Sequence, residues 1–184
     1  MALQDFYPWA KAANMYIDQG TLIQWMQEHP SLLIVDVRDD DAVGGNIKGS
    51  MHCPDSTFVP DGLQLVRDCL TGGHSAQETR VVFHCMESAR RGPRCARRLY
   101  DSLNEEPLEG FSSSNIFVLK GGADLWIRRF WGDKSLVEAY DDAFWGFETP
   151  AAGSSPHSLY QRPPDQLSTE WSAAGADLVK GKEE

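Results

Sequence analysis

The sequence predicts an α/β fold built on a mostly parallel β-sheet with helices on both faces. Three short apolar runs, at residues 32–37, 81–83 and 115–119, have the length and the β-branched residues of strands that are buried on both faces. Segments with helical periodicity alternate with these runs, and such strand–helix alternation is typical of parallel sheets. The 184 residues suit one domain with additional terminal segments.

Helical segments are indicated by apolar residues spaced three and four positions apart. We expect one helix to begin at Thr21, whose hydroxyl can form a capping box with Gln24, and to stop at Pro30. Further helices are expected at 61–70, 94–103 and 123–131, and Trp126, Phe130 and Trp131 of the last are expected to face the core. The segment 94–103 is amphipathic, with its apolar face made of Ala96, Leu99, Tyr100 and Leu103.

Composition divides the chain into three parts. We expect an N-terminal extension at residues 1–13, a catalytic domain at 14–149 and a flexible C-terminal tail at 150–184. The tail is dominated by Gly, Ser, Pro and Ala and has few large apolar residues, which is typical of segments that cannot form a core. One short helix is expected within it, near residues 167–178.

Charge is distributed unevenly along an acidic chain. The formal net charge is −10, which is the opposite of what a general nucleic-acid binder shows. Residues 90–98 nevertheless hold five arginines and no acidic residue, whereas the rest of the chain carries 12 basic against 27 acidic residues. This local excess of positive charge indicates a small anionic ligand or an anionic side chain on a partner; an Arg-rich exposed helix face is the simpler alternative.

The cysteines predict free thiols rather than disulfides. No basic segment followed by an apolar run marks a signal peptide, and no apolar run is long enough to span a membrane. We therefore expect a cytoplasmic or nuclear protein, or one found in both compartments, with reduced cysteines. Cys53 and Cys85 each follow a histidine, but the short spacing of a structural zinc site is lacking, so no metal is expected.

The segment from His84 to Pro93 carries the chemistry. A predicted strand runs into His84-Cys85, a short loop follows, and Arg91-Gly92-Pro93 opens a predicted helix. Backbone N–H groups of such a loop can surround an anion, and the helix adds its positive N-terminal end. Both effects favour the thiolate form of Cys85. The planar guanidinium of Arg91 can hold two oxygens of a phosphate or arsenate.

Two other loop residues could take part in proton transfer. Ser88 could donate a hydrogen bond to the thiolate and later to the leaving sulfur. Glu87 could protonate a leaving oxygen, although a bound dianion would repel its carboxylate, and a position facing solvent is the alternative. In a purely structural interpretation, Cys85 is a buried strand-end cysteine and Arg91 an ordinary helix-start arginine.

These residues resemble a known family. His84-Cys85-x5-Arg91-Gly92-Pro93 is similar to the active-site loop of the M-phase inducer (cell-division-cycle dual-specificity) phosphatases, which have a rhodanese fold, and to that of the small eukaryotic arsenate reductases. Residues 34–38 and 44–50 resemble the family's Asp-x-Arg and Gly-His-Ile-x-Gly-Ala segments. Residues 117–122, with Trp126, resemble its last strand and Gly-Gly turn.

The resemblance implies a rhodanese-like fold with a five-stranded, mostly parallel sheet. It also implies that Cys85 is the nucleophile and Arg91 the oxyanion-binding arginine. The substrate would be held by the backbone amides of Met86, Glu87, Ser88, Ala89 and Arg90. Two departures stand out: Asn46 replaces a common histidine, and Val37 replaces a cysteine that can form a protective disulfide in the phosphatases. Cys53, Cys69 or Cys95 is left as a candidate resolving thiol.

Several activities are compatible with this loop. The first is a protein tyrosine or dual-specificity phosphatase that acts through a thiophosphate intermediate and needs no cofactor. The second is an arsenate reductase that uses glutathione or glutaredoxin as external reductant. Sulfur transfer from thiosulfate usually needs a loop one residue shorter, and a non-catalytic module that reads phosphorylated partners would not need Cys85. The expected partners are a phosphorylated protein or a small oxyanion, with glutaredoxin added for the reductase.

Overall fold

A computed structural model of the chain describes residues 9–10, 13–28, 31–71 and 78–146. The chain forms two compact units, Met1–Glu148 and Thr149–Glu184, and every described residue belongs to the first. The predicted tail and its helix near 167–178 lie outside the described residues. Within the described part, no helix is long and apolar enough to cross a membrane.

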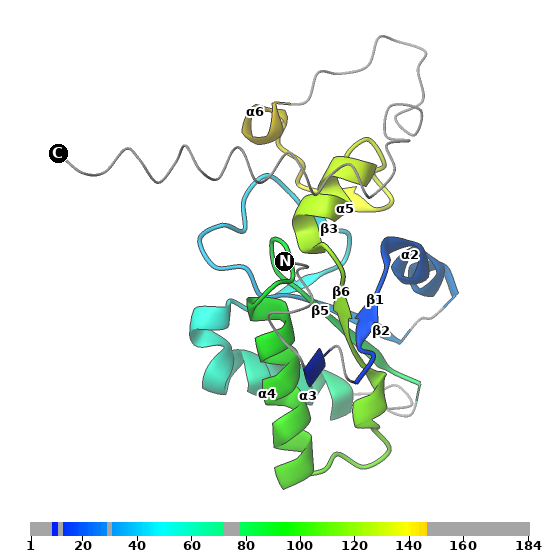
Figure 1. Cartoon of the computed structure of the whole chain (residues 1–184), viewed down its shortest axis with the longest axis vertical. Helices are drawn as coiled ribbons and strands as arrows, with labels where there is room; N and C mark the ends of the chain where they lie inside the picture. Colours follow the sequence, from blue (N-terminus) through cyan, green and yellow to red (C-terminus); the bar gives the residue numbers. More distant parts are fainter. Residues whose placement is uncertain (1–8, 11–12, 29–30, 72–77, 147–184) are drawn as a thin grey trace, which may run out of the picture. The chain divides into compact units, whose positions relative to one another are not determined.

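The first unit is organised around a five-stranded parallel sheet. The strand order is β1-β6-β5-β2-β4, and all four pairings are parallel, as predicted (Figure 1). The three central strands coincide with the apolar runs of the sequence, whereas the two edge strands have only two residues each. The strands are β1 (Tyr16–Ile17), β2 (Leu32–Asp36), β4 (Met51–His52), β5 (Arg80–His84) and β6 (Ile116–Leu119).

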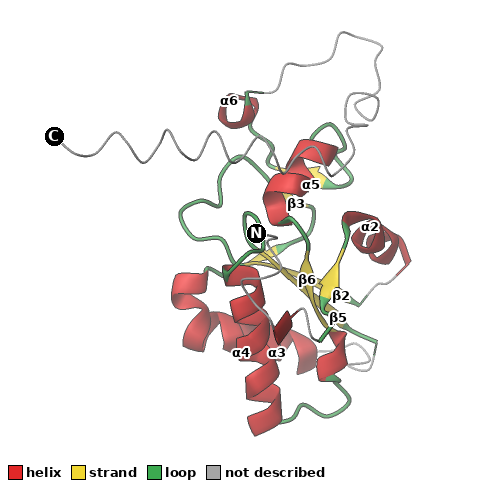
Figure 2. Cartoon of the chain, in the orientation of Figure 1, coloured by secondary structure: helices red, strands yellow, loops and turns green. Residues whose placement is uncertain are grey.

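Four helices cover the two faces of this sheet (Figure 2). Helices α3 (Leu63–Thr71) and α4 (Arg91–Glu105) share one core with Val35 and Phe83 of the strands. Helices α2 (Gln19–Glu28) and α5 (Gly122–Phe130) share a second core with strand residues of the other face, such as Ile34 and Val82. Neighbouring strand residues therefore point to opposite cores, which is why the central strands read as continuous apolar runs. Trp126 and Phe130 are buried, as predicted.

Short elements complete the unit. A two-stranded antiparallel sheet pairs β3 (Asn46–Ile47) with β7 (Val137–Glu138). Single helical turns are formed by η2 (Asp55–Thr57), η3 (Phe58–Gly62), η4 (Ser113–Asn115) and α6 (Asp142–Trp145). Trp9 and Ala10, from the predicted N-terminal extension, pack on the α3–α4 side of the sheet.

Some helix boundaries differ from the predictions. Helix α2 begins at Gln19 and not at Thr21, because Asp18 provides the cap by accepting a hydrogen bond of 2.8 Å from the Thr21 amide. Helix α4 begins at Arg91, where Arg91-Gly92-Pro93 was predicted to open it, three residues before the amphipathic segment 94–103. Pro93 lies in the first turn, where its missing N–H has no partner in the helix anyway.

Candidate active site

The predicted catalytic loop lies at the carboxyl edge of the parallel sheet. Strand β5 ends at His84, and helix α4 begins at Arg91, so Cys85 and the five residues after it form the connection. In a parallel sheet, the segments that follow neighbouring strands meet at one edge. The segments after β2 and β6 accordingly contribute contacts to this loop.

Cys85 is held in a tight turn. Its side chain is buried, and its backbone N–H donates to the hydroxyl oxygen of Ser88 at 3.4 Å. Ser88 is itself buried and has a φ of 55°, which reverses the chain within the loop. The structure thus places the Ser88 hydroxyl beside the backbone of Cys85. Glu87 is half-buried.

The loop is tied to helix α5 through its carbonyl groups. The amides of Ala123 and Asp124 donate to the carbonyl oxygens of Cys85 and Met86, at 2.9 and 2.8 Å. In a planar trans peptide the N–H points opposite to the C=O, so the amides of Met86 and Glu87 face away from α5. The first turn of a helix has N–H groups without intrahelical acceptors, and here the loop supplies the acceptors.

Gly122 makes this approach possible. It has a φ of 57°, and a Cβ atom at this position would overlap the carbonyl oxygens of both Cys85 and Met86. In the sequence, the two successive glycines resembled only a turn after the last strand. Their place at the junction of a strand and a helix was the available signal that two backbones come close there.

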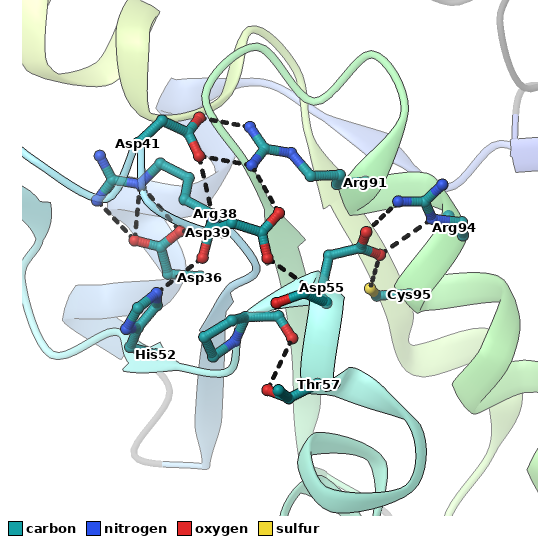
Figure 3. Close-up of polar contacts among 12 residues, drawn as sticks. Asp36, Arg38, Asp39, Asp41, His52, Asp55, Thr57, Arg91, Arg94 and Cys95 are labelled. Carbon is teal, nitrogen blue, oxygen red and sulfur yellow. Dashed lines mark hydrogen bonds and ion pairs between the residues drawn. The ribbon is translucent and has the colours of Figure 1, made fainter.

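Two carboxylates from the loop after β2 accept hydrogen bonds from the guanidinium group of Arg91 (Figure 3). Its Nη1 lies 2.5 Å from Oδ1 of Asp41 and 3.1 Å from Oδ2 of Asp39, and its Nη2 contacts Oδ2 of Asp41. Chiefly because Asp41 accepts these hydrogen bonds, the pKa of Arg91 is raised above its ordinary value. The hydrogen bonds from Arg91 likewise lower the pKa of Asp41. Nothing in the sequence analysis anticipated this contact.

The other arginines of residues 90–98 are largely matched by acidic side chains of the same chain. Arg94 pairs with Asp55 of η2 (Figure 3). Arg98 pairs with the same carboxylate, and Arg97 pairs with Asp101 at 2.7 Å. The thiol of Cys95 also donates to Asp55, at 3.2 Å. The excess positive charge seen in the sequence is therefore mostly compensated within the fold, and it does not by itself mark a ligand surface.

A buried ion pair lies at the end of β2, beside the end of β5. Arg38 and Asp36 are both buried and form an ion pair at the strand end, with Nε of Arg38 2.9 Å from Oδ2 of Asp36. Arg38 Nη2 also donates to Asn46 Oδ1 at 2.8 Å and to the carbonyl of Gly45 at 2.9 Å. Asn46, which replaces a family histidine, thus serves as an acceptor for Arg38.

The histidine before Cys85 belongs to the same network. His84 is fully buried, and its Nδ1 lies 3.8 Å from Oδ1 of Asp36. Burial lowers the pKa of His84, which keeps the ring neutral at pH 7. Burial alone would raise the pKa of Asp36, but nearby His84 and the hydrogen bonds and charge of Arg38 hold it below the ordinary value.

The remaining cysteines are free thiols in different environments. Cys53 and Cys95 are buried, and Cys69 is exposed. Burial raises the pKa of Cys53 to about 11, and burial together with the hydrogen bond to Asp55 raises that of Cys95 further. Both buried thiols are therefore protonated at neutral pH in this conformation.

Comparisons with known proteins agree with this architecture. Residues 18–129 match the model of the rhodanese-like domain family. The chain is 33% identical over 140 residues to the dual specificity phosphatase ibp1 of Schizosaccharomyces pombe, an alignment that covers 68% of this chain and 96% of the relative. It is 34% identical over 112 residues to arsenate reductase 2.1 of Oryza sativa subsp. japonica, covering 60% of this chain and 66% of the relative.

A solved structure shows the same fold. Ygr203w, described as a yeast protein tyrosine phosphatase of the rhodanese family, superposes with a TM-score of 0.61 at 32% identity. The match covers 71% of this chain and 95% of Ygr203w. These relatives are all named as enzymes, so the comparisons indicate an enzyme. The chain belongs to the rhodanese-like domain family.

Proposed function

We propose that this chain is a cysteine-dependent phosphatase of the protein tyrosine or dual-specificity type. The observation that carries the proposal is the loop from Cys85 to Arg91. Its Cys85 and Met86 carbonyls are bound to α5, which turns the amides of Met86 and Glu87 away from that helix. Amides that converge on one point form an anion site, and the nucleophile lies at the start of the loop.

The proposed reaction has two steps. The Cys85 thiolate attacks phosphorus, the bond from phosphorus to the leaving oxygen breaks, and that oxygen takes a proton. Water then attacks the thiophosphate, the sulfur–phosphorus bond breaks, and inorganic phosphate leaves. The charge that builds up on the equatorial oxygens is offset by Arg91 and by the amides of residues 86–90. A phosphorylated protein is the substrate class, and no cofactor or metal takes part.

Arsenate reduction is the second candidate. The loop contains a single carboxylate, that of Glu87, and the sequence offers no other residue there to protonate a leaving oxygen. Reduction needs access for an external thiol after the first attack instead of such a donor. Cys85 would form a bond to arsenic as one arsenate oxygen leaves as water. Two thiols of glutathione or glutaredoxin would then be oxidised to a disulfide, which reduces As(V) to As(III) and releases arsenite and the free Cys85 thiol. The rice relative is named for this activity.

The test is the rate of hydrolysis of an aryl phosphate. We expect the wild-type rate to fall by roughly 1,000-fold or more in Cys85→Ser, because the nucleophile is lost. Cys69→Ser makes the same change at an exposed cysteine and should retain the wild-type rate. A wild-type rate no higher than that of Cys85→Ser would contradict the phosphatase proposal. Arsenite formation with glutathione and glutaredoxin, measured on the same three proteins, would then decide the second candidate.

A further inference from the structure

The contacts of Arg91 occupy only part of its guanidinium group. An arginine has five N–H donors in a fixed plane. The contacts with Asp39 and Asp41 use both N–H groups of Nη1 and one of Nη2. In the described part of the chain, no acceptor contacts Nε. The Nε–H and the second Nη2–H therefore remain, and they lie on the same edge of the group.

This open edge has the geometry that a tetrahedral oxyanion requires. Two parallel N–H groups of one guanidinium edge match two oxygens of a phosphate or an arsenate. The guanidinium also lies within electrostatic reach of the nucleophile, because the charge of Cys85 contributes to raising the pKa of Arg91. The Nη1–Nη2 edge of Arg91 thus binds carboxylates of the same chain, and the Nε–Nη2 edge is left for an oxyanion.

The two carboxylates are themselves fixed in place. Oδ1 of Asp39 accepts a hydrogen bond of 2.9 Å from the amide of Ser56 in η2. The amide of Asp39 donates to Oδ1 of Asp41 at 3.0 Å, which links the two residues. Arg38, directly before them, is anchored in the buried pair with Asp36. The carboxylates are therefore held on a fixed segment that follows a buried strand end.

Stability does not explain this arrangement well. The side chains of Arg91, Asp39 and Asp41 are 23%, 30% and 37% exposed, and ion pairs in such positions contribute little to folding. Orientation is a better explanation, since an unrestrained arginine loses rotational freedom whenever it binds a ligand. A guanidinium already held in one plane avoids that loss at the binding step.

We propose that Asp41, assisted by Asp39, is a positioning residue that holds one edge of Arg91 and presents the Nε–Nη2 edge to the substrate oxyanion. The inference rests on the proposed function, in which Arg91 binds the anion. It adds that the affinity for the anion depends on two residues that do not touch it.

Charge and orientation have opposite effects at this position, which makes the inference testable. The negative charge of Asp41 repels a dianion, so removing that charge alone should tighten anion binding. Losing the hydrogen bonds that hold Arg91 in place should weaken anion binding. Asp40→Asn is the matched control, because Asp40 is exposed, lies in the same segment and loses the same charge without contacting Arg91.

The experiment measures the dissociation constants of inorganic phosphate and inorganic arsenate by calorimetry on Cys85→Ser protein, in which no turnover occurs. We expect Asp41→Asn to bind each anion roughly tenfold more weakly than Asp40→Asn, because Arg91 is no longer held. In an Arg91→Lys background, which lacks the second edge, Asp41→Asn and Asp40→Asn should bind equally. Thermal unfolding of each variant shows that the proteins compared are folded.

Three results would overturn the inference in different ways. Equal or tighter binding by Asp41→Asn than by Asp40→Asn would show that the carboxylate does not position Arg91, while leaving the anion site intact. A difference between the two that persists in the Arg91→Lys background would show that Asp41 acts through another residue. If the Cys85→Ser protein binds neither anion, the proposed function fails, and the inference fails with it.

Discussion

Gly122 lies against the carbonyl oxygen of Cys85 so closely that no side chain fits between them. The contact joins the first turn of α5 to the loop that begins with Cys85, the proposed nucleophile, through the hydrogen bonds of Ala123 and Asp124. A residue that contributes no functional group is thus placed where a single added carbon would displace Cys85.

Gly122→Ala is therefore expected to damage both stability and activity. The new Cβ must push the carbonyls of Cys85 and Met86 away, which breaks two hydrogen bonds and shifts the loop. Together with the positive φ, this should cost more than about 3 kcal/mol in the free energy of unfolding. Urea unfolding measures that loss, and phosphate binding to the folded fraction measures the damage to the loop.

Gly49→Ala separates the clash from the backbone strain. Gly49 also has a positive φ, of 74°, but a Cβ there would meet no atom within 4 Å. Its substitution should cost only the strain, roughly 1–2 kcal/mol, and leave anion binding intact. If the two variants lose the same stability and bind phosphate equally well, the close approach at Gly122 is unimportant.

Asp36→Asn should be among the most destabilising single changes in the domain. It leaves the buried guanidinium of Arg38 without its charged partner, and breaking a buried pair from one side typically costs about 3–5 kcal/mol. Denaturant unfolding of Asp36→Asn is the measurement, with Asp40→Asn as an exposed control. Adding Arg38→Met should restore part of the lost stability, because no unpaired charge then remains. A double variant that is less stable than Asp36→Asn would contradict this account.

The Asp36–Arg38 pair also predicts that the free energy of unfolding falls at acid pH. The pKa of Asp36 in the folded protein lies below the ordinary value of 3.8, so its ionised form stabilises the fold above that pH. This contribution should shrink as the pH falls below 3.8 and vanish below the lower pKa of the folded state. Unfolding free energies of wild type and Asp36→Asn, measured from pH 7 downward, should converge in that range. Parallel curves through the acid range would show that Asp36 is not the titrating group.

The environment of Tyr16 predicts that the protein becomes less stable at alkaline pH. Its hydroxyl donates to the carbonyl of Ser88 at 3.4 Å, and burial, with a smaller effect from Cys85, raises its pKa to about 12. The unfolded chain ionises this phenol near pH 10, so stability should fall as the pH rises from about 10 to 12. An absorbance titration of the folded protein should contain a late phenol transition that Tyr16→Phe removes. Tyr100→Phe should leave this transition in place, and late transitions of unchanged amplitude in Tyr16→Phe would refute the assignment.

The central strands could be predicted from the sequence because they follow local hydrophobic patterns. The runs at 32–37, 81–83 and 115–119 are continuous because both faces of the central strands are buried, and all three became strands. The order of strand, Cys85, loop and Arg91 also predicted that Cys85 directly follows β5 and that Arg91 begins α4. The edge strands β1 and β4 were not predicted from the residues, since two residues carry no recognisable period.

The rest of the site depends on contacts between distant residues. Arg91 meets Asp41, which lies 50 positions earlier, and no spacing rule connects them. The run Asp39-Asp40-Asp41 was read only as part of the acidic balance of the chain, although it directly follows a buried strand end. Gly122 meets Cys85 only because β5 and β6 are neighbours in the sheet. Such pairings are set by strand order, which residue patterns do not encode.

The link between α5 and the nucleophile loop has a consequence for hydrogen exchange. Amides in the first turn of a helix usually exchange quickly with solvent, because they have no intrahelical acceptor. The amides of Ala123 and Asp124 instead donate to Cys85 and Met86, so they should exchange as slowly as amides inside the helix. Deuterium uptake at Ala123 and Asp124 thereby measures how often the loop from Cys85 to Arg91 opens, in the wild type and in its variants.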